Sequence, residues 1–288
     1  MENPEVISWF DPDTFTGTHL AICPQTGRCA IFDSVLDFDP ASGRTSRKSA
    51  DRLIEYIRNR NLSVQWIIET HAHADHLSAA PYLKQELGGG IGIGQAITQV
   101  QETFGKVFNT GHEFKTDGRQ FDHLFEDGEK YRVGELEARC FHTPGHTPAC
   151  MTHVIGDAAF VGDTLFMPDY GTARCDFPGG DAATLYDSVQ KIFQLPDETR
   201  VFLCHDYLPE GREEYVLETT VGKQKRENIH LQQGISRDEF VQMRTERDAG
   251  LDMPRLILPS VQVNMRAGQM PPADDNGVSY LKLPLDQL

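Results

Sequence analysis

The stretch ETHAHADHLSAA, from Glu69 to Ala80, is the part of this sequence on which the interpretation of the whole chain depends. It follows the apolar run Val64–Ile68, which predicts a buried strand. Within six positions it carries four groups that can bind a metal: His71, His73, Asp75 and His76. Residues two apart on an extended segment point to the same side, so His71 and His73 can face one ion. The stretch therefore predicts a metal-binding turn at the end of a strand.

Three further polar residues follow short apolar runs in the same way. FHTPGHTPAC places His146 after a Pro-Gly turn, and AFVGDTLF and VFLCHDY place Asp163 and His205 at predicted strand ends. If these strands share one sheet edge, the side chains meet where open sheets bind ligands. Seven nitrogen and oxygen ligands could hold two metals, whereas two histidines and one carboxylate could hold one Fe(II) with open positions. Imidazole and carboxylate suit both zinc and iron, so the spacing leaves the metal open.

Predicted strands and helices are interspersed along the chain. A turn at Gln25–Arg28 joins His19–Pro24 and Cys29–Val35 in a predicted hairpin. The other predicted strands are Val64–Ile68, Glu135–Thr143, Asp157–Asp163 and Arg200–His205. The predicted helices are Ser49–Leu62, with Ser49 or Asp51 as its cap, and Ser78–Leu87, Ala182–Leu195 and Arg237–Gly250. Met270–Gly277 is predicted to be a loop. This pattern suits two sheets with helices outside them, an α+β arrangement.

Composition limits the classes of function. The 288 residues, 39% of them hydrophobic, suit one large domain. A net charge of −16 argues against nucleic acid or an anionic membrane as the main partner. The six cysteines form no CxxC pair, which favours reduced thiols in a cytosolic protein. The start MENPEVISWF has neither a basic segment nor a long apolar core, and no apolar run is long enough to span a membrane. We therefore expect a cytoplasmic protein.

Four motifs carry a resemblance to a known family. THAHADH, TPGHT, GDTLF and CHD, in this order, resemble the metallo-β-lactamase superfamily. That resemblance implies an αββα sandwich, two mixed β-sheets flanked by helices, as a single domain over residues 1–288. A C-terminal helical and loop extension would begin at about residue 230. The metals of this fold lie at one edge of the two sheets.

Within the superfamily, the chain resembles the persulfide dioxygenases, in particular a bacterial glutathione-dependent subtype. The segment GTARCDFPGGDAATLYDSV (Gly171–Val189) carries this likeness, together with HDY, DEFV and NMRAG. Glyoxalase II-type hydrolases usually have bulkier residues where this chain has Ala72 and Ala74, and a GCGKFFEG-like segment that this chain lacks. An insertion at Glu102–Gly118 and a longer tail depart from the pattern of the persulfide dioxygenases.

The resemblance implies one Fe(II) per chain, held by His71, His146 and Asp163. His73, Asp75, His76 and His205 would surround these ligands. The substrate would be glutathione persulfide, oxidised by O2 to sulfite and glutathione. The residues implied in substrate binding are Arg174, Tyr207, Lys223, Lys225 and Arg226. Asp176 offers a competing structural role for Arg174, as its ion-pair partner in the loop beside the metal.

Other functions remain open on the sequence alone. In a glyoxalase II-like thioester hydrolase with a binuclear zinc or mixed-metal site, His73, Asp75, His76 and His205 would be direct ligands. A non-enzymatic metal-binding or redox partner protein would be expected to have lost at least one ligand, and none is missing. Cys150 and Cys204 lie near the predicted site, but free cysteines are usually buried and inert. A homodimer is also among the expectations.

Overall fold

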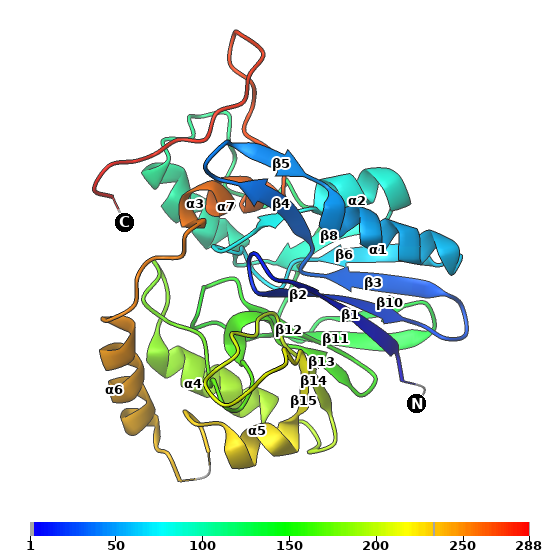
Figure 1. Ribbon diagram of the computed structural model, residues 1–288, viewed down its shortest axis with the longest axis vertical. Helices are drawn as coiled ribbons and strands as arrows, with labels where there is room; N and C mark the ends of the chain where they lie inside the picture. Colours follow the sequence, from blue (N-terminus) through cyan, green and yellow to red (C-terminus); the bar gives the residue numbers. More distant parts are fainter. Residues whose placement is uncertain (1–2, 233, 288) are drawn as a thin grey trace.

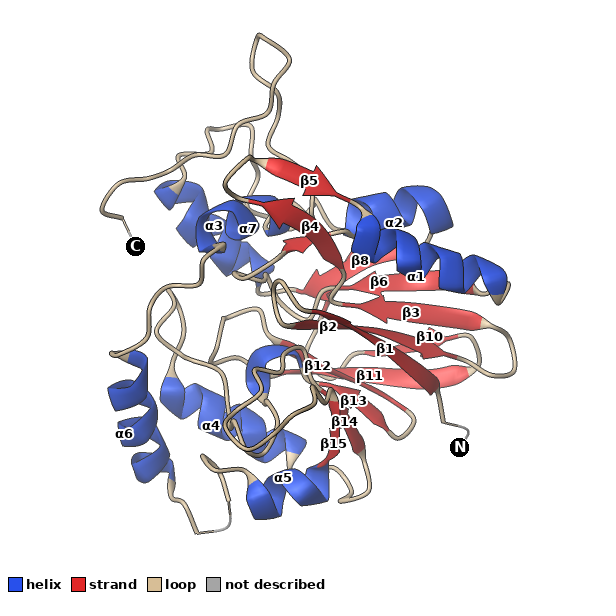
Figure 2. Ribbon diagram, viewed as in Figure 1, coloured by secondary structure: helices blue, strands red, loops and turns tan. Residues whose placement is uncertain are grey.

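The computed structural model describes residues 3–232 and 234–287. Two six-stranded sheets form the interior and helices cover their outer faces (Figures 1 and 2). The rings of Phe32 and Phe160, one from each sheet, stack with their centroids 4.0 Å apart and form part of the core between the sheets. This arrangement confirms the predicted α+β sandwich with two mixed sheets.

The first sheet has the strand order β1-β2-β3-β6-β8-β9. Its strands are β1 (Glu5–Asp11), β2 (Thr16–Ile22), β3 (Arg28–Phe32), β6 (Ser63–Ile68), β8 (Gly90–Gly94) and β9 (His123–Phe125). β2 and β3 pair antiparallel, which confirms the predicted hairpin. β3, β6, β8 and β9 run parallel, so their carboxyl ends lie along one edge of the sheet.

The second sheet has the order β10-β11-β12-β13-β14-β15. Its strands are β10 (Lys130–Val133), β11 (Leu136–His142), β12 (Met151–Ile155), β13 (Ala158–Phe160), β14 (Arg200–Phe202) and β15 (Glu218–Thr220). β13 and β14 are parallel neighbours, so the segments that follow them leave the sheet at the same edge. A small third sheet joins β5 (Arg44–Ser46), β4 (Val35–Asp39) and β7 (Leu77–Ser78).

The helices divide between the two outer faces (Figure 1). On the first sheet lie α1 (Lys48–Asn59), α2 (Ala80–Leu87), α3 (Ile97–Val107) and α7 (Ile257–Asn264). On the second lie α4 (Ala182–Ile192), α5 (Val221–Glu227) and α6 (Arg237–Asp248), with α6 packed against α4. Among the described residues, no helix has the length and apolar character needed to cross a membrane.

The starts of α1 and α4 differ in how they are capped. Neither Ser49 nor Asp51 caps α1, which begins earlier, at Lys48. The Ser49 hydroxyl instead donates to Asp37 at 2.7 Å, so it ties the helix to β4. Asp181 caps α4 by accepting the backbone N–H of Thr184 at 2.7 Å, as a capping carboxylate should.

Candidate metal centre

The loop between β6 and β7 carries four of the seven predicted ligands. It is neither strand nor helix, and the chain bends at His71 before it reaches His73. Their rings nevertheless lie side by side, with centroids 4.1 Å apart. Asn264, at the end of α7, shapes the loop: its amide donates to the carbonyls of His73 and His76 at 2.8 and 2.7 Å. A residue distant in sequence therefore sets the curvature that brings these side chains together.

The other three ligands come from the edge of the second sheet. His146 lies between β11 and β12, and His205 follows β14. Asp163 lies in a short 3-10 turn, Gly162–Thr164, and not at the strand end, because β13 stops at Phe160. The parallel pairing of β13 and β14 explains why Asp163 and His205 emerge side by side.

Gly162 allows the two sheets to approach each other at this edge. Its φ is +53°, and a Cβ there would lie 2.5 Å from the hydroxyl oxygen of Thr70, in the loop after β6. Thr70 in turn donates its N–H and hydroxyl to the carboxylate of Asp33, at 2.7 and 3.0 Å. A larger residue than glycine would push the turn that carries Asp163 away from the histidines of the first sheet.

A first group of ligands consists of His71, His146 and Asp163. One donor atom from each residue lies within 4.8 Å of the other two. The Nε2 atoms of His71 and His146 are 3.8 and 3.5 Å from Asp163 Oδ2, and all three side chains are buried. Two imidazoles and one carboxylate on one side of an ion are the donor set of non-haem Fe(II) oxygenases.

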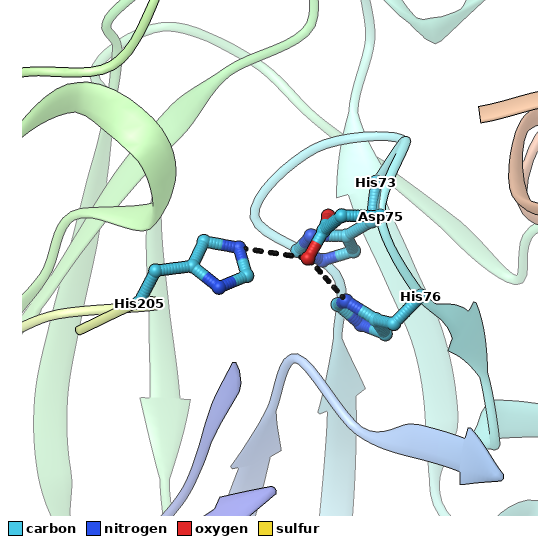
Figure 3. Close-up of side chains that lie close together, drawn as sticks. All are labelled: His73, Asp75, His76 and His205. Atoms are coloured by element: carbon cyan, nitrogen blue, oxygen red, sulfur yellow. Dashed lines mark ion pairs between the residues drawn. The ribbon is translucent and has the colours of Figure 1, made fainter. Parts of the chain in front are cut away.

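A second group lies directly beside the first and consists of His73, Asp75, His76 and His205 (Figure 3). Asp75 Oδ2 is 3.2 Å from His205 Nε2 and 3.5 Å from His76 Nδ1. Asp163 connects the groups, because its Oδ1 is 3.4 Å from His205 Nε2. The structure therefore brings all seven predicted ligands to one place.

Most donor atoms of the two groups are buried polar atoms that lack a hydrogen-bond partner among the described residues. Six of them are buried without a hydrogen-bond partner in the described part of the chain: His71 Nε2, His73 Nδ1, His76 Nε2, His205 Nε2, Asp75 Oδ2 and Asp163 Oδ1. An unpartnered buried polar atom costs about 1–3 kcal/mol. Six of them converging on one point are compensated when a cation lies between them. The residues present therefore fit a metal ion.

The electrostatics of the site follow from burial and from the mixture of charges. Burial lowers the pKa of His71 well below its usual value, and the neighbouring histidines lower it further. Burial alone would also lower the pKa of His205, but the carboxylates of Asp163 and Asp75 raise it. Burial alone would raise the pKa of Asp75, but the neighbouring His205 and His76 hold it below the usual value. The centre thus favours an ionised Asp75 and a neutral His71, the forms that bind a metal.

Hydrogen bonds around the ligands fix their orientation. His73 Nε2 lies between Asp33 Oδ1 and Glu69 Oε2, at 3.0 and 3.2 Å, which leaves Nδ1 for the centre. His146 Nδ1 donates to the carbonyl of Arg174 at 2.8 Å. Such contacts set the tautomer and raise the basicity of a ligand.

His205 is oriented in the same way, because its Nδ1 donates to the carbonyl of Phe15 at 3.0 Å. Asp33, Glu69 and Phe15 are not among the residues predicted from the sequence, and Asn264 is predicted only as part of the NMRAG motif. One signal for Asp33 is available in the sequence, since it follows the apolar run Cys29–Phe32 directly, and Asp163 and His205 also follow apolar runs.

A cavity of about 340 Å³ leads from the surface to the centre, where Asp75, His146 and Asp163 form part of its lining. The cavity has aromatic walls, formed by Phe166, Tyr170, Phe177 and Tyr207. Tyr207 lines the cavity, and its ring stacks on that of His205 with the centroids 5.6 Å apart.

Arg174 also lines the cavity and forms the ion pair considered for it. Its guanidinium pairs with Asp176 through two contacts of 2.6 Å, and the pair is partly shielded from solvent. It also donates to the carbonyl of Asp252 at 2.6 Å. The predicted ion pair is present, and it stands at the wall of the cavity.

The structure does not bring the predicted basic stretch to this cavity. Lys225 and Arg226 line a separate surface depression, and Lys225 pairs with Asp197 at 2.6 Å. Lys223 is exposed on α5 and lines neither hollow. The physical reason is that α5 lies on the outer face of the second sheet, whereas the cavity opens at the sheet edge. The expected contact of these three residues with substrate is thus corrected.

The cysteines near the centre show no sign of reactivity. All six cysteines are free and buried. Burial raises the pKa of Cys150 to about 12 and that of Cys204 well above its usual value. Thiols held protonated in this way are poor nucleophiles.

Comparison with known proteins places these features in a family. A family model described as the metallo-beta-lactamase superfamily matches residues 21–205. A probable metallo-hydrolase of Burkholderia pseudomallei is 56% identical, covering 98% of this chain and 99% of that protein. Glyoxylase B2 of Dictyostelium discoideum is 50% identical over 100% of this chain and 99% of its own length.

More distant matches bear a different name. The mitochondrial persulfide dioxygenase ETHE1 of Homo sapiens is 30% identical, over 91% of this chain and 88% of that protein. The crystal structure of ETHE1 from Myxococcus xanthus superimposes with a TM-score of 0.72 at 28% identity, covering 92% of this chain and all of that one. The sandwich, the ligand cluster at its edge and these matches lead to one conclusion: the chain belongs to the metallo-beta-lactamase superfamily.

Proposed function

We propose that this protein is a persulfide dioxygenase that oxidises glutathione persulfide with O2. The observation that carries the proposal is the first ligand group, in which His71, His146 and Asp163 converge at the end of the cavity. Two histidines and one carboxylate leave room on an iron for a sulfur ligand and for O2 side by side. The likeness to ETHE1 over the length of both chains supports this choice.

The reaction balances without a further reductant. Glutathione persulfide, O2 and water give glutathione, sulfite and two protons. The sulfur–sulfur bond breaks, the outer sulfur loses four electrons, and O2 gains the same four. Fe(II) held by the three ligands would supply the redox chemistry that lets O2 react with a paired-electron sulfur compound.

The residues of the chain would contribute position and shielding. The contact from His146 Nδ1 to the carbonyl of Arg174 turns Nε2 toward Asp163. The rings of Phe166, Tyr170 and Tyr207 form an apolar wall beside the buried ligands and limit the access of water. Holding two reactants together at such a site supplies much of the rate enhancement expected of it.

The second candidate is a glutathione thioester hydrolase with two metals. It is favoured by the second ligand group, which offers His73, Asp75, His76 and His205 beside a shared Asp163. It is also favoured by the names of two relatives that are 50% and 56% identical, which point to glyoxalase or hydrolase activity. Both candidates use the same cavity, and they differ in the number of metals and in the need for O2.

One experiment separates the two. Oxygen uptake is recorded after glutathione persulfide is added to Fe(II)-loaded protein, and the metal content is measured on the same sample. Uptake with sulfite formed in equal amount, at about one iron per chain, is the result we expect. Hydrolysis of a glutathione thioester without oxygen uptake, at about two metals per chain, would overturn the proposal in favour of the hydrolase. Metal-free protein is the control for both assays.

A further inference from the structure

Four arginines line the cavity, and two of them are already engaged by the protein. Arg174 pairs with Asp176 and donates to the carbonyl of Asp252. Arg244 is buried, pairs with Asp248 at 2.6 Å and donates to the carbonyl of Thr172. These two guanidinium groups are held by the protein itself and have few N–H donors left for a ligand.

The other two, Arg247 and Arg255, have no such partners. Both are exposed, and neither forms an ion pair or a side-chain hydrogen bond with any described residue. Arg247 lies over the ring of Tyr170, 5.9 Å from its centroid, so one face of the guanidinium is packed while its N–H edge stays available. Arg255 lies in the segment between α6 and α7 and reaches the same cavity.

The segment that carries these arginines is fixed to the metal centre. Asp248 accepts the backbone N–H of Cys175 at 2.8 Å, and Arg174 holds the carbonyl of Asp252. The backbone carbonyl of Arg174 also accepts a hydrogen bond from Nδ1 of His146, one of the predicted metal ligands. The distance from Arg247 and Arg255 to the centre is therefore set by hydrogen bonds, as a selective binding site requires.

The remaining charges at the cavity define which ligand fits. Asp13 and Asp252 also line it and are exposed. They would repel a ligand that carries only negative charge, but they would attract an ammonium group. The two free arginines of the same cavity match carboxylates, which a guanidinium binds in a bidentate manner. The pattern favours a zwitterionic, peptide-like compound over a simple anion.

We propose that Arg247 and Arg255 form a carboxylate subsite that recognises the part of the substrate remote from its sulfur. The inference rests on the proposed function only in taking a glutathione compound as substrate. Glutathione carries two carboxylates and one ammonium group, and it therefore matches the charges of this cavity. The subsite takes the place of the one predicted from sequence at Lys223, Lys225 and Arg226.

The test measures binding apart from turnover. S-methylglutathione, whose sulfur is blocked, is titrated calorimetrically into the metal-loaded protein and into its Arg247→Gln and Arg255→Gln variants. Arg237→Gln is the matched control, because Arg237 is on the same helix α6 but pairs with Asp187 away from the cavity. We expect each cavity variant to weaken binding about tenfold, the effect of one lost charged hydrogen-bond pair, and the control to bind like the wild type.

A second probe tests the chemistry of recognition. The diester of S-methylglutathione lacks both carboxylates, so it should bind wild type and variants with equal affinity. Unchanged binding of S-methylglutathione by both cavity variants, or no binding to the wild type, would overturn the subsite. A loss of affinity in the variants supports the subsite even if the protein shows no oxygen uptake. The subsite and the proposed function can therefore fail separately.

Discussion

The histidines of the metal centre differ from His19 and His153, which are equally buried but lie between the sheets. His19 donates from Nε2 to the carbonyl of Leu203 at 2.9 Å and accepts from the Ser8 hydroxyl at 2.7 Å. His153 contacts the Tyr131 hydroxyl at 3.0 Å and is surrounded by the rings of Phe32 and Phe125. Burial lowers the pKa of His19 to about 4 and that of His153 to about 3, so both are neutral core residues.

The comparison shows that burial alone does not identify a ligand. His153 also has one unpartnered nitrogen, Nε2, but aromatic rings surround it. At the centre, unpartnered nitrogens from four histidines face the carboxylates of Asp75 and Asp163. A metal site therefore differs from a single buried histidine in one respect: several unpartnered imidazole nitrogens and carboxylate oxygens converge on one point.

The largest difference between the histidines of the metal centre and those of the core should appear when Asp163 is removed. Asp163→Ala takes away the carboxylate that lies within 4 Å of His71, His146 and His205. We expect metal content to fall close to zero and activity to fall at least about hundredfold, since loss of a ligand exceeds the effect of losing its supporting contacts. Metal analysis of the purified protein and the oxygen-uptake assay measure the two effects.

The matched control for this variant is His153→Gln. It alters an equally buried histidine and should keep the full metal content at a lower melting temperature, because its role lies in the core. Wild-type metal content in Asp163→Ala, or metal loss in His153→Gln, would contradict the distinction between the two sets.

A smaller effect is expected at Asp33, which orients a histidine without being one of the seven proposed ligands. Asp33→Asn keeps the shape of the side chain but removes the charge that His73 Nε2 contacts. We expect metal affinity to fall about 10- to 100-fold, measured by competition with a chelator. Asp37→Asn is the control, since Asp37 only holds Ser49 of α1. Equal affinities for the two variants would show that His73 needs no orienting carboxylate.

The sequence predicted the layers and the candidate ligands that cluster at their edge, because both depend on short-range patterns. Apolar runs that end in histidine or aspartate give both the strand and the group at its end, as for Val64–Ile68 and His71. The position of Asp163 in a turn beyond β13 was missed, since nothing in the run DAAFVGD marks where pairing stops.

Contacts between distant segments could not be predicted in this way. Asn264 shapes the loop at His73 from 191 positions away, and only the folded chain brings them together. The same holds for the proposed carboxylate subsite. The basic run at α5 is conspicuous in the sequence but lies outside the cavity, whereas Arg247 and Arg255 are isolated in sequence and reach it. Charge density along the chain is a poor guide to charge in a pocket.

The smallest predicted effect concerns the neutral histidines of the core. The folded pKa values of about 4 for His19 and about 3 for His153 lie below the usual 6.5, so below pH 6.5 the unfolded chain binds more protons than the folded one. The free energy of unfolding therefore falls as pH decreases from about 6.5 to about 4, by up to about 1.4 kcal/mol per pH unit for each histidine.

His153→Gln tests this linkage, because the amide can keep the contact with Tyr131 but does not titrate. Urea unfolding of the metal-free variant and wild type is compared at pH 7.5, where histidines are neutral in both states, and at pH 5. The variant should be less stable at pH 7.5 but lose less stability on acidification, by about 1.4 kcal/mol per pH unit. An equal loss in both proteins would mean that His153 takes up a proton without unfolding. In that case the core would accommodate a charged imidazole.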